Sequence, residues 1–138
     1  MREILFKAKR ICDGEWVEGY YLRDQYHIGG KDIIFYRKDS DRFTVYTNII
    51  DIETICQFTG LTDKNGNKIW ENDILMAHLD ESYPEDVTYI TVKWNFAGFV
   101  AYEAGTDGEY LGEFDLEHYE VVGNIFDNKE LLQEETNE

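Results

Sequence analysis

The chain is rich in side chains that could act as acids, bases or metal ligands, but few have the spacing that such chemistry requires. Its 138 residues include 29 Asp and Glu and three His. Glu71 and Asp73 stand two positions apart and could in principle act as an acid–base pair. Because they directly follow a hairpin signal, we expect them instead to fix a turn by accepting hydrogen bonds from the backbone.

The stretch 63–67 (DKNGN) resembles the beginning of a calcium-binding loop. An EF-hand loop needs Gly at its sixth position and Glu at its twelfth, and here those positions are Lys68 and Ile74. A hairpin turn at Asn65 and Gly66 is therefore the better interpretation, because Asn-Gly is a strong signal for a type I′ turn.

Three carboxylates alternate with apolar residues close to the C-terminus. Glu113, Asp115 and Glu117 flank Phe114 and Leu116, which predicts a strand with one acidic face. Such a face could bind a hard cation. Exposed alternating acids are more often simply solvated, so we expect no metal here.

The histidines and cysteines also lack catalytic or metal-binding spacing. His27, His78 and His118 lie in three separate regions, and Cys12 and Cys56 form no C-x-x-C pair. The sequence contains no phosphate-binding loop, dinucleotide fingerprint or nucleophile elbow. We therefore expect no enzymatic activity and no cofactor, with both thiols reduced in the cytoplasm of a bacterial cell.

Alternating apolar residues predict strands along the whole chain. In residues 1–50 we expect a meander of about four strands, around 4–8, 16–22, 33–36 and 43–46. Five further short strands separated by turn signals follow, a pattern typical of a small barrel. Asn128 is a plausible N-cap for a short helix from Lys129 to Gln133 before an acidic tail.

The densest run of fold-specifying residues resembles a known family signature. Residues 57–74 (QFTGLTDKNGNKIWENDI) and 119–132 (YEVVGNIFDNKELL) are similar to motifs of the YopX family, small proteins of bacteriophages and prophages. The matching positions, all interpreted as structural, are Gln57, Phe58, Thr59, Gly60, Leu61, Asp63, Lys64, Asn65, Gly66, Ile69, Trp70, Glu71, Asp73, Ile74, Gly123, Asn124 and Ile125.

The resemblance implies an SH3-like barrel in the C-terminal half but no established activity. Three positions depart from the family pattern. Cys56 and Asn72 stand where Gly is usual, and Lys129 replaces a Pro. Because Asn tolerates positive φ, Asn72 should keep the backbone of the Gly it replaces. The expected fold is mainly β: an N-terminal antiparallel meander (1–50) packed on an SH3-like barrel with a short terminal helix (51–138).

Negative charge is concentrated in the C-terminal half. The net charge is −16, with +1 in residues 1–50, −6 in residues 51–100 and −11 in residues 101–138. Such a surface repels phosphate backbones, so we expect no direct binding to nucleic acid. The charge either keeps the protein in solution or offers an acidic surface to a basic partner.

Three functional hypotheses follow. The first is a non-catalytic accessory protein that binds a protein partner or itself, and the second is an acidic inhibitor that mimics nucleic acid toward a basic host protein. A carboxylate-dependent enzyme is the third.

The surplus of tyrosines at Tyr20, Tyr21, Tyr26, Tyr36 and Tyr46 is compatible with a binding patch or with a strand core. No apolar run is long enough to span a membrane. We expect a homo-oligomer assembled through the near-neutral residues 1–50.

Overall fold

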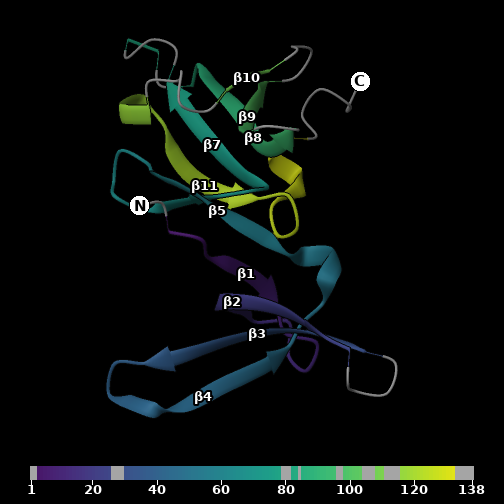
Figure 1. Ribbon diagram of the computed structural model, residues 1–138. Helices are drawn as coiled ribbons and strands as arrows, with labels where there is room; N and C mark the ends of the chain where they lie inside the picture. The colour runs from purple at the N-terminus through teal and green to yellow at the C-terminus, as the bar shows by residue number, and fades with distance from the viewer. Residues whose placement is uncertain are drawn as a thin grey trace. The chain divides into compact units, whose positions relative to one another are not determined.

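The chain is mainly β and divides into two compact units, Met1–Phe58 and Thr59–Glu138 (Figure 1). The computed structural model describes residues 3–25, 30–78, 82–83, 85–95, 98–103, 108–110 and 116–132. Within these residues the helices are short 3-10 turns and none is an α-helix. None of the described helices is long and apolar enough to cross a membrane.

The first sheet begins with the meander that the alternating pattern predicts, and this prediction is confirmed. Its hydrogen-bonded order is β4-β3-β2-β1-β5-β6, so the first four strands each pair with their neighbours in sequence. The strands are β1 (Phe6–Lys9), β2 (Trp16–Asp24), β3 (Lys31–Lys38), β4 (Asp41–Ile49), β5 (Cys56–Thr62) and β6 (Lys68–Trp70).

Strand β5 begins in the first unit and ends in the second. After the 3-10 turn η1 (Ile52–Thr54), the chain returns to β1, where Gln57 lies opposite Phe6. The backbone N–H of Phe58 donates to the carbonyl of Leu5 at 2.8 Å. The second hydrogen-bonding neighbour of β1 is thus a strand that lies some fifty residues later in the sequence.

The core of the first unit covers one face of its sheet. Ala8, Ile34 and Ile50 are fully buried there. The partly buried side chains packed against them are Phe6, Val17, Tyr21 and Ile55. The register places Ile34 opposite both Tyr21 and Asn48, so this face of β2, β3 and β4 is the inner one. We call it the inner face.

The second unit contains a five-stranded antiparallel sheet of order β10-β9-β8-β7-β11. The strands are β7 (Asp73–His78), β8 (Val87–Asn95), β9 (Gly98–Glu103), β10 (Glu109–Tyr110) and β11 (Glu120–Asn124). Its core is larger than that of the first unit. The core residues are Ile69, Leu75, Ile90, Val92, Phe99 and Ala101, with Leu61, Leu116, Tyr119 and Val121 packed against them.

The SH3-like barrel expected in this half does not close within the part of the chain that the structure describes. Strands β10 and β11 stand at the two ends of the sheet order and no described pairing joins them. The first hairpin strand, β5, is hydrogen-bonded to β1 instead of joining this sheet. A closed barrel needs every strand to have two neighbours within it, and β5 pairs with β1 of the first sheet instead.

The Asn65-Gly66 hairpin exists, but the predicted type I′ turn is wrong. Of these two residues only Gly66 has positive φ, at +82°. The N–H of Gly66 donates to the carbonyl of Asp63 at 3.0 Å, and the N–H of Asp63 donates to the carbonyl of Asn67 at 2.9 Å. This is a three-residue loop, a type I turn followed by a left-handed Gly. The Asp63 carboxylate favours it by accepting hydrogen bonds inside the loop.

Gly66→Val is expected to lower the free energy of unfolding of the second unit by about 1–2 kcal/mol. A Cβ at this position would meet no atom within 4 Å, so the cost is backbone strain at φ +82° rather than a clash. Thermal melts of Gly66→Val and Gly66→Asn measure it. Asn tolerates positive φ and should melt between the parent and the Val variant, and equal melting of all three contradicts the assignment.

The C-terminal end differs from the predictions at two places. Residues Leu116–His118 form a 3-10 turn (η3) and not the end of an acidic strand, and Leu116 packs on the core of the second unit. The expected helix is only a 3-10 turn (η4, Lys129–Leu132). The side chain of Asn128 does not bond to the turn that follows it; instead its Oδ1 accepts from the N–H of the preceding Asn124 at 3.1 Å. The acidic tail after Leu132 lies outside the described residues.

Gly123→Ala is expected to destabilise the second unit by about 1–2 kcal/mol. A Cβ on Gly123 would lie 2.4 Å from the Asn128 Oδ1 atom, so the side chain of Asn128 must leave its bond to Asn124. The double variant Gly123→Ala/Asn128→Ala removes the obstructing side chain. Denaturant titration should therefore show that Gly123→Ala costs less in an Asn128→Ala background, and additive effects would contradict this reason.

Candidate functional site

Asp63 is buried and holds three backbone donors. Its side chain is 6% exposed. One carboxylate oxygen accepts from the N–H groups of Asn65 and Asn67, both at 2.9 Å, and the other accepts from the N–H of Val121 at 2.9 Å. Burial acts to raise its pKa, but the hydrogen bonds from Val121, Asn67 and Asn65 outweigh it, so the pKa lies below its ordinary value. Asp63 therefore ties the hairpin to β11.

Asp73 and Asn72 fix the turn between β6 and β7. Asp73 is 2% exposed and accepts from the N–H of Trp70 at 2.8 Å, as the sequence predicted for a carboxylate after a hairpin. Asn72 has φ +72°, which confirms that it keeps the backbone of the Gly it replaces. Its N–H donates to the carbonyl of Val92 at 2.7 Å, and its side chain accepts from Lys93 at 2.9 Å. This turn positions β6 and β7 through the carboxylate of Asp73 and the backbone of Asn72.

The remaining motif residues are also built into the scaffold. Thr59 donates to the carbonyl of Ile69 at 2.7 Å, and Asn124 accepts from the N–H groups of Phe126 and Asp127 at 2.9 Å each. Phe58, Trp70 and Ile74 are buried, Gln57, Leu61, Glu71, Gly123 and Ile125 are half-buried, and Gly60 and Lys64 are exposed. Thr59 and Asn124 thus bond within the second unit, whereas Gln57 and Phe58 belong to the first.

The other candidates for chemistry are scattered or fall outside the described residues. Glu113, Asp115 and His27 belong to the segments outside the description. His78 and His118 are exposed. Among the residues that the structure describes, no group of three His, Cys, Asp or Glu could hold a metal ion. Neither cysteine forms a disulfide; Cys12 is exposed, and Cys56 is buried with its thiol donating to the carbonyl of Thr54 at 3.3 Å.

The clearest candidate site is the outer face of β2, β3 and β4, opposite the core of the first unit. The register aligns Tyr20 with Phe35 and Thr47, and Leu22 with Ile33 and Ile49, on this face. Exposure is 52% for Tyr20, 50% for Leu22, 45% for Val45 and 44% for Ile49. We call Tyr20, Leu22, Ile33, Phe35, Val45 and Ile49 the outer patch.

The outer patch contrasts with an ordinary solvated sheet face. Antiparallel sheets usually present polar side chains on the face turned to water. Here the rings of Tyr20 and Phe35 lie 5.7 Å apart at 41°, a contact between aromatic side chains on that outer face. Phe43, two residues beyond Val45 along β4, is 96% exposed. The outer face of β2, β3 and β4 therefore exposes apolar side chains where a solvated sheet face would present polar ones.

Charged residues of both signs border the outer patch. Asp24 lies opposite Lys31 at the end nearer Leu22, and Glu18 lies opposite Lys7 on the same face of β2 and β1. The first unit as a whole carries nine basic and ten acidic side chains, so its net charge is −1. The second unit carries four basic and nineteen acidic side chains, a net charge of −15.

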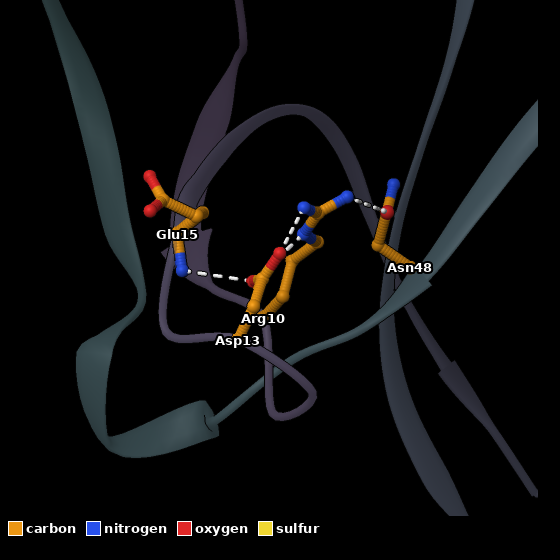
Figure 2. A network of polar contacts seen from close by, with 4 residues as sticks. All are labelled: Arg10, Asp13, Glu15 and Asn48. Carbon is orange, nitrogen blue, oxygen red and sulfur yellow. Dashed lines mark hydrogen bonds and ion pairs between the residues drawn. The ribbon is translucent and has the colours of Figure 1, made fainter.

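A polar network on the inner side holds the edge strand β4 in register (Figure 2). Arg10 forms an ion pair with Asp13 and donates to Asn48 Oδ1 at 3.5 Å, while Asp13 also accepts from the N–H of Glu15 at 3.0 Å. The Asn48 amide donates to the Ile34 carbonyl at 3.4 Å. The hydrogen bond from Arg10 lowers the pKa of Asp13, and the N–H of Glu15 adds to this effect. With Asn48 held inward, its neighbours along β4 face outward.

Comparison with known proteins identifies the family. The sequence matches the family model described as "YopX protein" over residues 5–133. The chain belongs to the YopX family. It is similar in fold to a crystal structure of protein EF1440 from Enterococcus faecalis, with 23% sequence identity and a TM-score of 0.60. That match covers 96% of this chain and 99% of the other. Among curated proteins, no sequence matches this one.

The outer patch contains none of the YopX signature residues. Of the tyrosines at 20, 21, 26, 36 and 46, Tyr20 lies on the outer face and Tyr21 packs with the core. Tyr36 and Tyr46 stack at 5.3 Å, and Tyr26 lies outside the described residues. The signal that could have found the patch is the unbroken apolar run 33–36, because a strand with one solvated face should alternate.

Proposed function

We propose that this YopX-family protein is a non-catalytic accessory module of a phage or prophage that binds protein through the outer patch. The observation that carries the proposal is an apolar face of three neighbouring strands with four side chains 44–52% exposed. The carboxylates Asp63 and Asp73, which an enzyme would need free, are engaged by backbone N–H groups. Both observations favour recognition over catalysis.

The experiment is capture from a bacterial lysate with the full chain immobilised. Leu22→Glu/Ile49→Glu changes two outer-patch residues, and Leu132→Glu is a matched control, because Leu132 is 40% exposed and lies in the second unit. Captured proteins that persist at about 0.5 M salt and disappear with the double variant support the proposal, since apolar contacts resist screening. Equal capture of bacterial proteins by all three proteins overturns binding of a bacterial partner through the outer patch.

A second candidate is an acidic module that binds a basic host protein. The net charge of −15 on Thr59–Glu138 favours it, because a concentrated negative field attracts basic surfaces. In the same experiment this function predicts capture that is insensitive to the Leu22→Glu/Ile49→Glu change. It also predicts release of the captured protein as the salt concentration rises.

A further inference from the structure

We infer that the outer patch is the contact between two copies of this chain, packed face to face around a two-fold axis. The inference rests on the proposed function and names its partner. Among the described residues, the buried cluster on the inner face of the first unit is small and consists of Ala8, Ile34 and Ile50. A second sheet packed about 10 Å away would give the other side the cover that sandwich proteins have.

The border of the outer patch suits a copy of itself. In a two-fold contact each surface meets the same surface, so its charges must complement themselves. Asp24 and Lys31, and Glu18 and Lys7, are cross-strand neighbours in the register and supply both signs on the same face. A strongly acidic or basic partner would gain little from such a border, whereas a second copy can place each acidic group near a basic one.

The size of the face indicates a concentration-dependent dimer. Three strands spaced about 4.8 Å apart, with a rise of about 3.3 Å per residue, give the eight residues of β3 a face of roughly 14 by 26 Å. That is below the roughly 800 Å² per partner of a standard interface. The charged residues that border the patch must therefore contribute, and the dimer should dissociate on dilution.

Salt should strengthen this contact. Each copy carries a net charge of −16, mostly on the second unit, so two copies repel at low ionic strength. Screening removes that repulsion, while the apolar contact is retained. A contact between an acidic face and a basic one would respond in the opposite direction.

The first test is the mass of the full chain by light scattering and sedimentation from about 1 to about 100 µM, at low and moderate salt. We expect a monomer–dimer equilibrium that shifts toward dimer with concentration and with salt. A monomer at every concentration overturns the inference. If that monomer still captures lysate proteins through Leu22 and Ile49, the proposed function stands and only the second copy is refuted.

The second test uses opposite charges on the same face. Leu22→Glu/Ile49→Glu and Leu22→Lys/Ile49→Lys should each weaken the dimer at least tenfold, although the Lys variant reduces the net charge of the chain. Leu132→Glu should dimerise like the parent. Circular dichroism and melting of each variant establish whether it is folded. If a double variant is not folded, Val45→Glu, on the edge strand β4, is used in its place.

Mixing the two double variants in equal amounts should restore dimers, because each face then meets the opposite charge. Folded variants that dimerise like the parent would show that the contact lies elsewhere, for instance along the edge of β4, and overturn the inference. A mixture that stays monomeric overturns the face-to-face arrangement.

Discussion

Replacing Asp63 by Ala is expected to lower the free energy of unfolding of the second unit by about 3–5 kcal/mol, one of the largest effects of any single change in this chain. The reason is that one buried carboxylate accepts from three backbone N–H groups, those of Asn65, Asn67 and Val121. Ala leaves these donors without their acceptor and detaches the hairpin from β11. Denaturant titration followed by Trp fluorescence measures the loss.

The control variant Asp63→Asn keeps an acceptor oxygen and removes the charge, so it should lose less than Asp63→Ala. It also isolates the pH dependence. Because the folded-state pKa of Asp63 is lowered, its contribution is fully present above the unfolded value of about 3.9 and is lost as pH falls through the folded pKa. The stability gap between parent and Asp63→Asn should therefore narrow below about pH 4. A gap that is constant from neutral to acid pH would contradict the charge-based explanation.

Gly19→Ala is expected to destabilise the first unit by about 3 kcal/mol, even though Ala is the better residue for most strand positions on entropic grounds. A Cβ on Gly19 would lie 2.4 Å from the carbonyl oxygen of Phe35 and 2.9 Å from Ile34 Cγ2. The oxygen belongs to the backbone of β3, so the strand itself must move.

Melting of the first unit, followed at Trp16, measures the effect of Gly19→Ala. The neighbouring exposed Glu18 offers a control on the same strand, and Glu18→Ala should stay within about 0.5 kcal/mol of the parent. If the Gly19→Ala and Glu18→Ala variants have the same melting temperature, the close approach of β2 and β3 at this point is wrong.

Much of the fold could be predicted from alternating residues, because each half buries one face of a sheet. Ile34 and Ile50, for example, lie on the inner face while Val45, Thr47 and Ile49 point out. Sequence could not predict that β5 would pair with β1, since pairing partners are chosen by tertiary contact and not by local pattern. In the part of the chain that the structure describes, β5 is therefore hydrogen-bonded to β1 and is not part of the second sheet.

Neither the type of the hairpin loop nor the outer patch could be predicted from local sequence patterns, because both depend on contacts made in the folded chain. Asn-Gly is compatible with two hairpin loops, and the Asp63 carboxylate, which bonds inside the loop, favours the three-residue one. The outer patch consists of ordinary strand residues from three strands, and it becomes a surface only when the register aligns Leu22, Ile33 and Ile49. The family signature includes Asp63 and Asp73, which accept hydrogen bonds in the turns of the second unit, but it carries no information about this face.

The pairing of β1 with β5 has a consequence for how the protein is made. A ribosome synthesises Phe6 and Lys7 roughly fifty residues before Gln57 and Cys56, their partners on one side. At about 5–20 residues per second, that edge of β1 remains bare in the nascent chain for about 2–10 s. Lys7 and Lys9 lie on this short strand, and lysines discourage unwanted strand pairing. The charges of Lys7 and Lys9 therefore disfavour incorrect pairing at the open edge of β1 until β5 has been synthesised.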